Sequence, residues 1–212
     1  MGLELDHFFI LTEPGAPAAS LLTNIGLIEG VANDHPGQGT SNRRFFFADS
    51  MLELLYIRDA MEATVGPGSR LRLAERIADH SASPFGLVFR STEDSTFENF
   101  PGWQYFPEYL GVDQYFYIGE NSDHIDQPLC ILLPHAFSKP IKQPGNGRFE
   151  CVTEVRVSLP SRRTSPVLEN VAQCRKLSLI SGEPHLMEVV FNGNREHQSE
   201  DLRPFIPLTI SW

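Results

Sequence analysis

A histidine and a glutamate stand inside two apolar stretches of the chain, and this pair could carry acid–base or metal chemistry. His7 lies in LELDHFFILT, and Glu53 lies in MLELLYI. Aromatic and aliphatic runs of this length predict β-strands, in which alternate residues share one face. Glu53 then shares a face with Met51 and Leu55, where an ionised carboxylate is costly without a partner. His7 can be that partner if both strands face one cavity.

The pair admits two kinds of chemistry and one structural interpretation. Imidazole and carboxylate groups suit Zn, Mn, Fe or Ni, with substrate oxygens completing the coordination. Without a metal, the same two groups can act as a general base and the group that orients it. The structural interpretation is a hydrogen-bonded core histidine at position 7 and a glutamate at a solvated strand edge. The residues alone leave these alternatives open.

A polar, glycine-containing loop, HPGQGTSN, precedes the second of these stretches. Its glycines permit positive φ angles and let backbone amides approach a ligand. His35, Thr40 and Asn42 are therefore candidates for binding a small polar substrate at the mouth of a cavity, although the same residues also suit a turn-rich connection. Arg43 and Arg44 follow on a strand and point to opposite faces, so Arg44 is a candidate for binding a substrate carboxylate.

The composition limits the classes of partner. The chain has 212 residues, of which 41% are hydrophobic, and its formal net charge is −10. This acidity disfavours nucleic acids and anionic membrane surfaces, and no segment approaches the apolar length of a membrane span. The N-terminus lacks a basic region typical of a signal peptide. Three cysteines without paired spacing indicate reduced thiols, so we expect a cytoplasmic protein that binds a small molecule.

The order of expected elements repeats along the chain. Strand, helix and three strands are expected within residues 1–59, and the same β-α-β-β-β order is expected again within 149–212. Residues 60–148 are then an insertion that supplies extra strands, a helix and an aromatic-rich lid. A repeat of this size indicates an α+β fold of paired modules in one domain spanning 1–212.

The motifs, taken together, resemble those of a known family. The glyoxalase-like branch of the vicinal oxygen chelate (glyoxalase, bleomycin resistance and dioxygenase) superfamily has an Asp-His strand, a His-Pro-Gly-x-Gly-Thr-x-Asn loop and a Leu-Glu-Leu strand. The matching residues here are Asp6-His7, His35-Pro36-Gly37, Gly39-Thr40, Asn42 and Leu52-Glu53-Leu54. The stretches PFGLVFRST and LRPFIPLTISW are also similar to that branch. This resemblance implies paired β-α-β-β-β modules that form an open, curved, barrel-like sheet around a central cavity.

The resemblance also implies roles for particular residues. In the metalloenzymes of the superfamily, ligands come from the first and fourth strands of each module. His7 and Glu53 match two of these positions, and Glu154 aligns opposite His7 in the second module, whereas PLTISW offers no counterpart of Glu53. The implied protein is a homodimeric lyase, isomerase or dioxygenase in which one divalent metal stabilises an oxyanion and His7 and Glu53 are catalytic. The alternative is a metal-free, cofactor-free binding protein of the bleomycin-resistance type.

Overall fold

The computed structural model describes residues 2–91, 100–134, 147–160 and 164–212. The aromatic-rich lid expected within residues 60–148 therefore falls partly outside the described residues. No helix in the described part of the chain is both long and apolar enough to cross a membrane.

The first half of an eight-stranded sheet comes from the N-terminal sixty residues. Its strands are β1 (Leu3–Leu11), β2 (Asn33–His35), β3 (Thr40–Phe46) and β4 (Met51–Ile57), and helix α1 (Ala19–Asn24) follows β1. The last strand of this half, β4, lies beside β1 and pairs with it in parallel. In this pair, Phe9 of β1 lies opposite Glu53 of β4. The β2–β3 hairpin lies within the stretch expected to be a loop.

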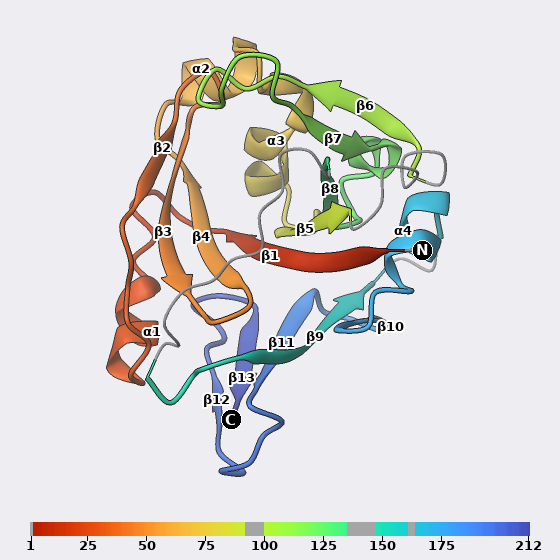
Figure 1. Cartoon of the computed structure of the whole chain (residues 1–212). Coiled ribbons are helices and arrows are strands. Elements are labelled where there is room, and N and C mark those ends of the chain that lie inside the picture. Colours follow the sequence, from red (N-terminus) through yellow and green to blue (C-terminus); the bar gives the residue numbers. More distant parts are fainter. Residues whose placement is uncertain (1, 92–99, 135–146, 161–163) are drawn as a thin grey trace.

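The second half of the sheet repeats this pairing. Its strands are β5 (Phe85–Ser91), β6 (Gly102–Tyr105), β7 (Phe116–Gly119) and β8 (Leu129–Leu133), and β8 pairs in parallel with β5. Strands β1 and β5 join the halves in an antiparallel pair, which gives the order β2-β3-β4-β1-β5-β8-β7-β6. Figure 1 shows this sheet curling around a central space. An α+β fold with an open, curved, barrel-like sheet is therefore present.

The strand pairing changes the expected division of the chain. The partner of the first module is the stretch 85–133, whereas residues 149–212 form a separate five-stranded sheet in the order β10-β9-β11-β13-β12. Its elements are β9 (Val152–Leu159), α4 (Pro166–Val171), β10 (Leu177–Ser181), β11 (Leu186–Phe191), β12 (Ser199–Asp201) and β13 (Leu208–Ser211). Both stretches contain apolar strands, and apolar character alone does not specify which strand a given strand will pair with.

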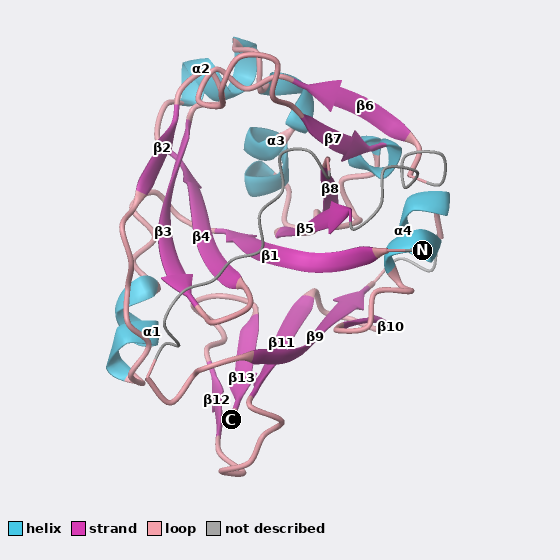
Figure 2. Cartoon of the chain, in the orientation of Figure 1, coloured by secondary structure: helices cyan, strands magenta, loops and turns pink. Residues whose placement is uncertain are grey.

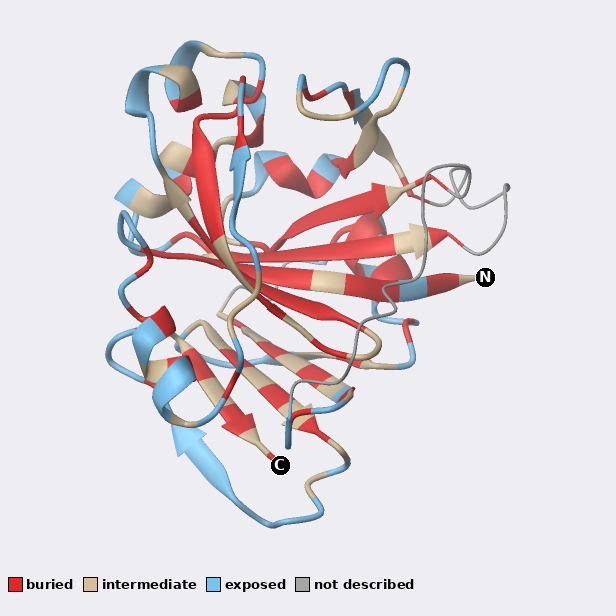
Figure 3. Ribbon diagram, turned by 60° about the vertical axis from the view of Figure 1, so that its left-hand side comes forward, coloured by how far each residue is buried: buried red, intermediate tan, exposed pale blue. Residues whose placement is uncertain are grey.

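Two apolar cores result from this arrangement. The larger core lies between the outer face of the curled sheet and the second sheet (Figure 2), and it contains Phe8, Leu52, Leu54, Phe85 and Val155. The smaller core lies inside the curl and includes Phe9, Leu55, Val88, Ile118 and Ile131. The central strands of the curled sheet are buried along most of their length in Figure 3, because both of their faces are covered.

A short helical segment closes one end of the curl. It consists of α2 (Ala60–Val65), a 3-10 turn (Ser69–Leu71) and α3 (Leu73–Ala78). The buried guanidinium of Arg76 fastens α3 to the segment before β8 by donating to the carbonyl oxygens of Ser83, Ile125, Gln127 and Ser122. Burial lowers the pKa of Arg76 to about 10. These carbonyl contacts replace the solvation that the buried charge loses.

Candidate functional site

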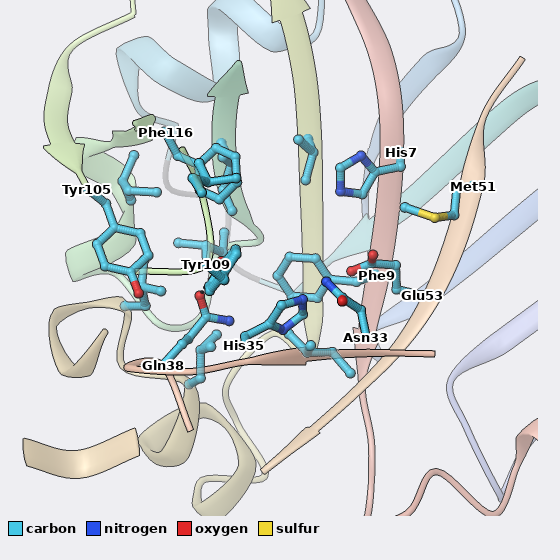
Figure 4. Close-up of a pocket in the computed structure, with 18 of the residues that line it drawn as sticks. His7, Phe9, Asn33, His35, Gln38, Met51, Glu53, Tyr105, Tyr109 and Phe116 are labelled. Carbon is cyan, nitrogen blue, oxygen red and sulfur yellow. Dashed lines mark hydrogen bonds between the residues drawn. The ribbon is translucent and has the colours of Figure 1, made fainter. Parts of the chain in front are cut away.

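The hollow of the curled sheet contains a cavity of about 290 Å³. Its two halves differ in chemistry. The β1–β4 half supplies its charged side chains, its imidazoles and its amides: His7, Asn33, His35, Gln38, Arg44 and Glu53. The β5–β8 half supplies aliphatic and aromatic side chains, among them Val88, Tyr105, Tyr109, Phe116, Ile118, Leu129 and Ile131. Figure 4 shows Glu53, His7, His35 and Asn33 at one end of the cavity and Tyr105 and Phe116 at the other.

The repeated topology explains this asymmetry. Strands β1 and β4 carry His7 and Glu53 into the cavity. Their topological counterparts, β5 and β8, contribute Val88, Leu129 and Ile131 to the same cavity. One half therefore keeps groups able to move protons, and the other provides a surface for an apolar ligand.

Glu53 lies on β4 with its carboxylate in the cavity. Its neighbours Leu52 and Leu54 point to the core between the sheets, so the alternation expected from the sequence is confirmed. Only 8% of Glu53 is exposed. The amide Nδ2 of Asn42 donates to its Oε1 over 3.1 Å. The carboxylate is thus held in place by a donor on the adjacent strand β3.

Asn42 is held in turn by the backbone. Its Oδ1 accepts a hydrogen bond of 2.8 Å from the backbone N–H of Asn33, the first residue of β2. Asn42 has no exposed surface and does not line the cavity. Its action on a ligand is therefore through Glu53, whereas the sequence indicated direct contact.

His7 owes its position to an irregularity in β1. The register between β1 and β5 shifts between Leu5 and His7, which places Asp6 in a bulge. Leu5 consequently joins the core between the sheets, although strict alternation places it on the face of His7. The bulge also brings Asp6 Oδ1 to 2.7 Å from His7 Nδ1, and Asp6 Oδ2 lies 3.2 Å from a guanidinium nitrogen of Arg90.

The surroundings of His7 favour its charged form. Burial lowers the pKa of His7, but the hydrogen bond to Asp6 and the negative charges of Glu53 and Asp6 outweigh burial, and the pKa is raised. The site thus places a histidine whose protonated form is favoured near a carboxylate. Each offsets the cost of burying the other.

His35 lies at the end of β2, and its surroundings favour its neutral form. Burial lowers its pKa, against the attraction of Glu53 and Asp34. Its Nδ1 is 2.9 Å from the hydroxyl of Thr40, and its ring centre lies 4.8 Å from that of Tyr109, with the two ring planes tilted by 41°. Thr40 is fully buried and, like Asn42, does not line the cavity.

Arg44 reaches the cavity from β3, opposite Glu53 in the strand pair. Its Nε donates to the backbone carbonyl of Val31 over 2.7 Å, and its guanidinium lies 5.1 Å from the centre of the Phe46 ring. Arg43 points elsewhere and forms a bidentate ion pair with Glu29. The two arginines therefore diverge as expected for consecutive strand residues.

Glu154 does not belong to this site, which corrects the ligand set implied by the resemblance. It lies on β9 in the second sheet, where its oxygens accept from Arg156 over 2.8 and 2.7 Å. Among the described residues, no three His, Cys, Asp or Glu side chains lie close enough together to hold a metal ion. The donors present do not fit the divalent metal.

Several cavity residues are missing from the sequence-based candidates. Asn33 precedes His35 by two positions, a strand spacing that could have indicated a shared face. Gln38 lies within the polar loop and carried no separate signal. Tyr105 and Tyr109 lie in an irregular aromatic stretch, where the sequence indicated a lid or simple packing. The structure brings both to the cavity.

Comparison with known proteins shows similarity at the level of the fold. No family model and no curated protein sequence matches the chain. A hypothetical protein from Staphylococcus aureus has a similar structure, with a TM-score of 0.58 and 11% identity over 99% of both chains. A methylmalonyl-CoA epimerase in complex with methylmalonyl-CoA aligns with a TM-score of 0.41 and 12% identity, covering 66% of this chain and 100% of that one. The methylmalonyl-CoA epimerase from Streptomyces coelicolor aligns with a TM-score of 0.40 and 13% identity over 63% of this chain and 97% of that one.

The match over the full length of the Staphylococcus aureus protein shows that the arrangement of both sheets occurs in a second protein. At this identity the likeness concerns the fold alone. The curled sheet is the architecture that the resemblance to glyoxalase-like proteins implies.

Proposed function

We propose that the protein is a small-molecule enzyme of the isomerase or lyase type, in which Glu53 moves a proton at a carbon next to an oxygen-bearing group. The observation that carries this proposal is the oriented, nearly buried carboxylate of Glu53, which faces a cavity with one polar and one apolar half, on the same side as His7. A protein that only needed stability would gain little by keeping it there.

His7 and Arg44 supply the charges that the reaction requires. Removing a proton next to a carbonyl leaves negative charge on the carbonyl oxygen, and a positioned cation stabilises that charge. His7, oriented by Asp6 and charged, is placed for this role. Arg44 lines the same end of the cavity and binds a carboxylate of the substrate.

The apolar half defines the rest of the substrate. Tyr105 and Phe116 lie at the end of the cavity away from Glu53 (Figure 4). A volume of about 290 Å³ lies near the lower limit of small-molecule pockets, which span roughly 300–1,000 Å³. The substrate is therefore a compact molecule with an apolar or aromatic body and an oxygen-rich end. No step is assigned to a metal ion, because the donors do not gather around one point.

Hydrogen–deuterium exchange tests this proposal. A panel of small 2-oxo acids and aryl-substituted acids is incubated with the protein in D₂O, and NMR follows exchange at the carbon next to the carbonyl. We expect exchange with the wild type, none with Glu53→Gln, and unchanged exchange with Glu154→Gln, a matched loss of charge outside the cavity. Treatment with a chelator should leave the rate unchanged. Equal exchange by the wild type and Glu53→Gln contradicts the proposal.

A second function, metal-free binding of a small aromatic ligand, is favoured by the tyrosine and phenylalanine side chains of the apolar half. Saturable binding of panel compounds without any exchange would favour this function over catalysis. Under it, Tyr109→Ala and Phe116→Ala weaken binding more than Glu53→Gln does.

A further inference from the structure

A chain of hydrogen bonds runs from Tyr109 to His35. The hydroxyl of Tyr109 donates to Gln38 Oε1 over 2.9 Å, and Gln38 Nε2 donates to Thr40 Oγ1 over 2.8 Å. Thr40 Oγ1 lies 2.9 Å from His35 Nδ1. Tyr109 comes from the segment between β6 and β7, whereas the other three residues belong to β2, β3 and their connection. These hydrogen bonds therefore connect one half of the curled sheet to the other.

The chemistry of these groups determines which group donates and which accepts in each of these hydrogen bonds. A side-chain amide nitrogen only donates, so Thr40 accepts from Gln38 through an oxygen lone pair. The hydroxyl hydrogen of Thr40 then needs an acceptor, because Thr40 has no exposed surface and an unbonded buried donor is destabilising. Within the described parts of the chain, His35 Nδ1 is the acceptor in hydrogen-bond contact with that hydroxyl. Nδ1 therefore carries a lone pair.

We infer that His35 is held as the neutral tautomer with its proton on Nε2, and that this N–H selects ligands with an acceptor oxygen beside Glu53. The burial that lowers the pKa of His35 is consistent with a neutral ring. The inference about the ligand rests on the proposed function, because it places the oxygen next to the group that Glu53 deprotonates. The tautomer itself depends only on the hydrogen bonds.

The two histidines of the cavity then have different tasks. His7 is oriented by a carboxylate and contributes a positive charge. His35 is oriented by a hydroxyl and contributes a neutral donor. A neutral donor recognises a carbonyl, carboxylate or enolate oxygen without attracting anions in general. His35 is thus a residue that determines specificity, and Thr40, Gln38 and Tyr109 are positioning residues.

The tautomer can be measured without a substrate. In a two-bond ¹⁵N–¹H correlation spectrum of ¹⁵N-labelled protein, with His35→Gln used for assignment, we expect the pattern of the Nε2–H form. Thr40→Val, which keeps the shape and removes the hydroxyl, should shift His35 toward a mixture of tautomers, and Thr40→Ser should restore the wild-type pattern. Gln38→Leu provides a second variant if Thr40→Val does not fold. Exposed His197 should be unchanged throughout.

The outcomes that overturn the inference are distinct from those that overturn the proposed function. An Nδ1–H pattern in the wild type would mean that His35 donates to Thr40 and that Nε2 carries no proton. This result removes the inferred donor, whether or not Glu53 is the base. For the ligand class, a 2-oxo acid should bind about tenfold more tightly than the saturated acid of the same skeleton, a preference lost in His35→Phe. Equal affinities, or binding of neither acid, contradict the assigned ligand class even where the tautomer is as expected.

Discussion

The side chain of Asn42 donates to Glu53 over 3.1 Å, so a residue without solvent exposure holds the carboxylate that faces the cavity. The sequence motif that resembles the glyoxalase-like family contains both residues. Only the structure shows that Asn42 acts on a ligand through Glu53. The distinction matters for mutagenesis, because Asn42 contributes a donor to Glu53 and an acceptor to the backbone N–H of Asn33.

Asn42→Asp separates these two contributions. The aspartate keeps an acceptor for Asn33 but replaces the donor by a second carboxylate next to Glu53. Like charges in contact raise the pKa of one of the pair, so we expect weaker ligand binding and a loss of about 1–3 kcal/mol in the free energy of unfolding at neutral pH. Urea denaturation at pH 5 and pH 8 measures the effect, which should be larger at pH 8. An equal loss at both values contradicts repulsion as the cause.

The histidines give the stability opposite dependences on pH. The pKa of His7 is raised in the folded protein, so its stabilising contribution is complete below the unfolded value of about 6.5 and is lost as the pH rises through the folded value. The pKa of His35 is lowered, so its contribution is present above about 6.5 and is lost as the pH falls through the folded value. The difference in melting temperature between wild type and His7→Asn should therefore shrink as the pH rises from 6 to 9.

The same measurement on His35→Asn provides the opposite case. The difference between wild type and this variant should shrink as the pH falls from 7 to 5. Two variants with pH dependences of the same sign would show that the environments of these rings differ from those described.

The sequence was informative where a single strand determines the outcome. The alternation around Glu53 predicted its face and its neighbours correctly. The capping of α4 by the Ser165 side chain and the pairing of β7 with β8 also follow from local features, a Ser-Pro pair and two apolar stretches that are close together in the sequence. These features depend on local periodicity and capping chemistry.

Features that depend on pairing between distant strands could not be obtained in this way. The stretches 85–133 and 149–212 both contain apolar strands, and only the pairing of β5 with β1 assigns the former to the curled sheet. The bulge at Asp6 likewise has no signature in the alternation of β1, although it moves Leu5 to the other face. Glu154 was expected in the cavity because the stretch 149–212, which contains it, was expected to form the second half of the curled sheet.

Glu154→Gln should not change ligand binding in the cavity. Glu154 pairs with Arg156 on the second sheet, and both side chains are partly exposed. Such pairs contribute about 0–1 kcal/mol to stability, so the free energy of unfolding should change by no more than that, and ligand affinity should not change. Calorimetric titration of any ligand found for the cavity measures the second effect. A loss of affinity comparable to that of Glu53→Gln would return Glu154 to the site.

Gly86 controls the space available to the cavity through Phe9. The two residues are opposed in the β1–β5 pair, and a Cβ added at Gly86 would lie 1.9 Å from the Phe9 ring. Gly86→Ala therefore forces this ring, which lines the cavity, away from its place. We expect a loss of about 1–3 kcal/mol in the free energy of unfolding, as for other overpacked cores, together with weaker ligand binding.

Phe9→Leu combined with Gly86→Ala tests this mechanism. The smaller side chain removes the clash, so the double variant should be more stable than the sum of the two single effects predicts, by at least about 0.5 kcal/mol. Gly182→Ala is the matched control, because a Cβ at Gly182 meets no atom within 4 Å. Additive effects of Gly86→Ala and Phe9→Leu would mean that the backbone of β5, and not the ring of Phe9, absorbs the added methyl group.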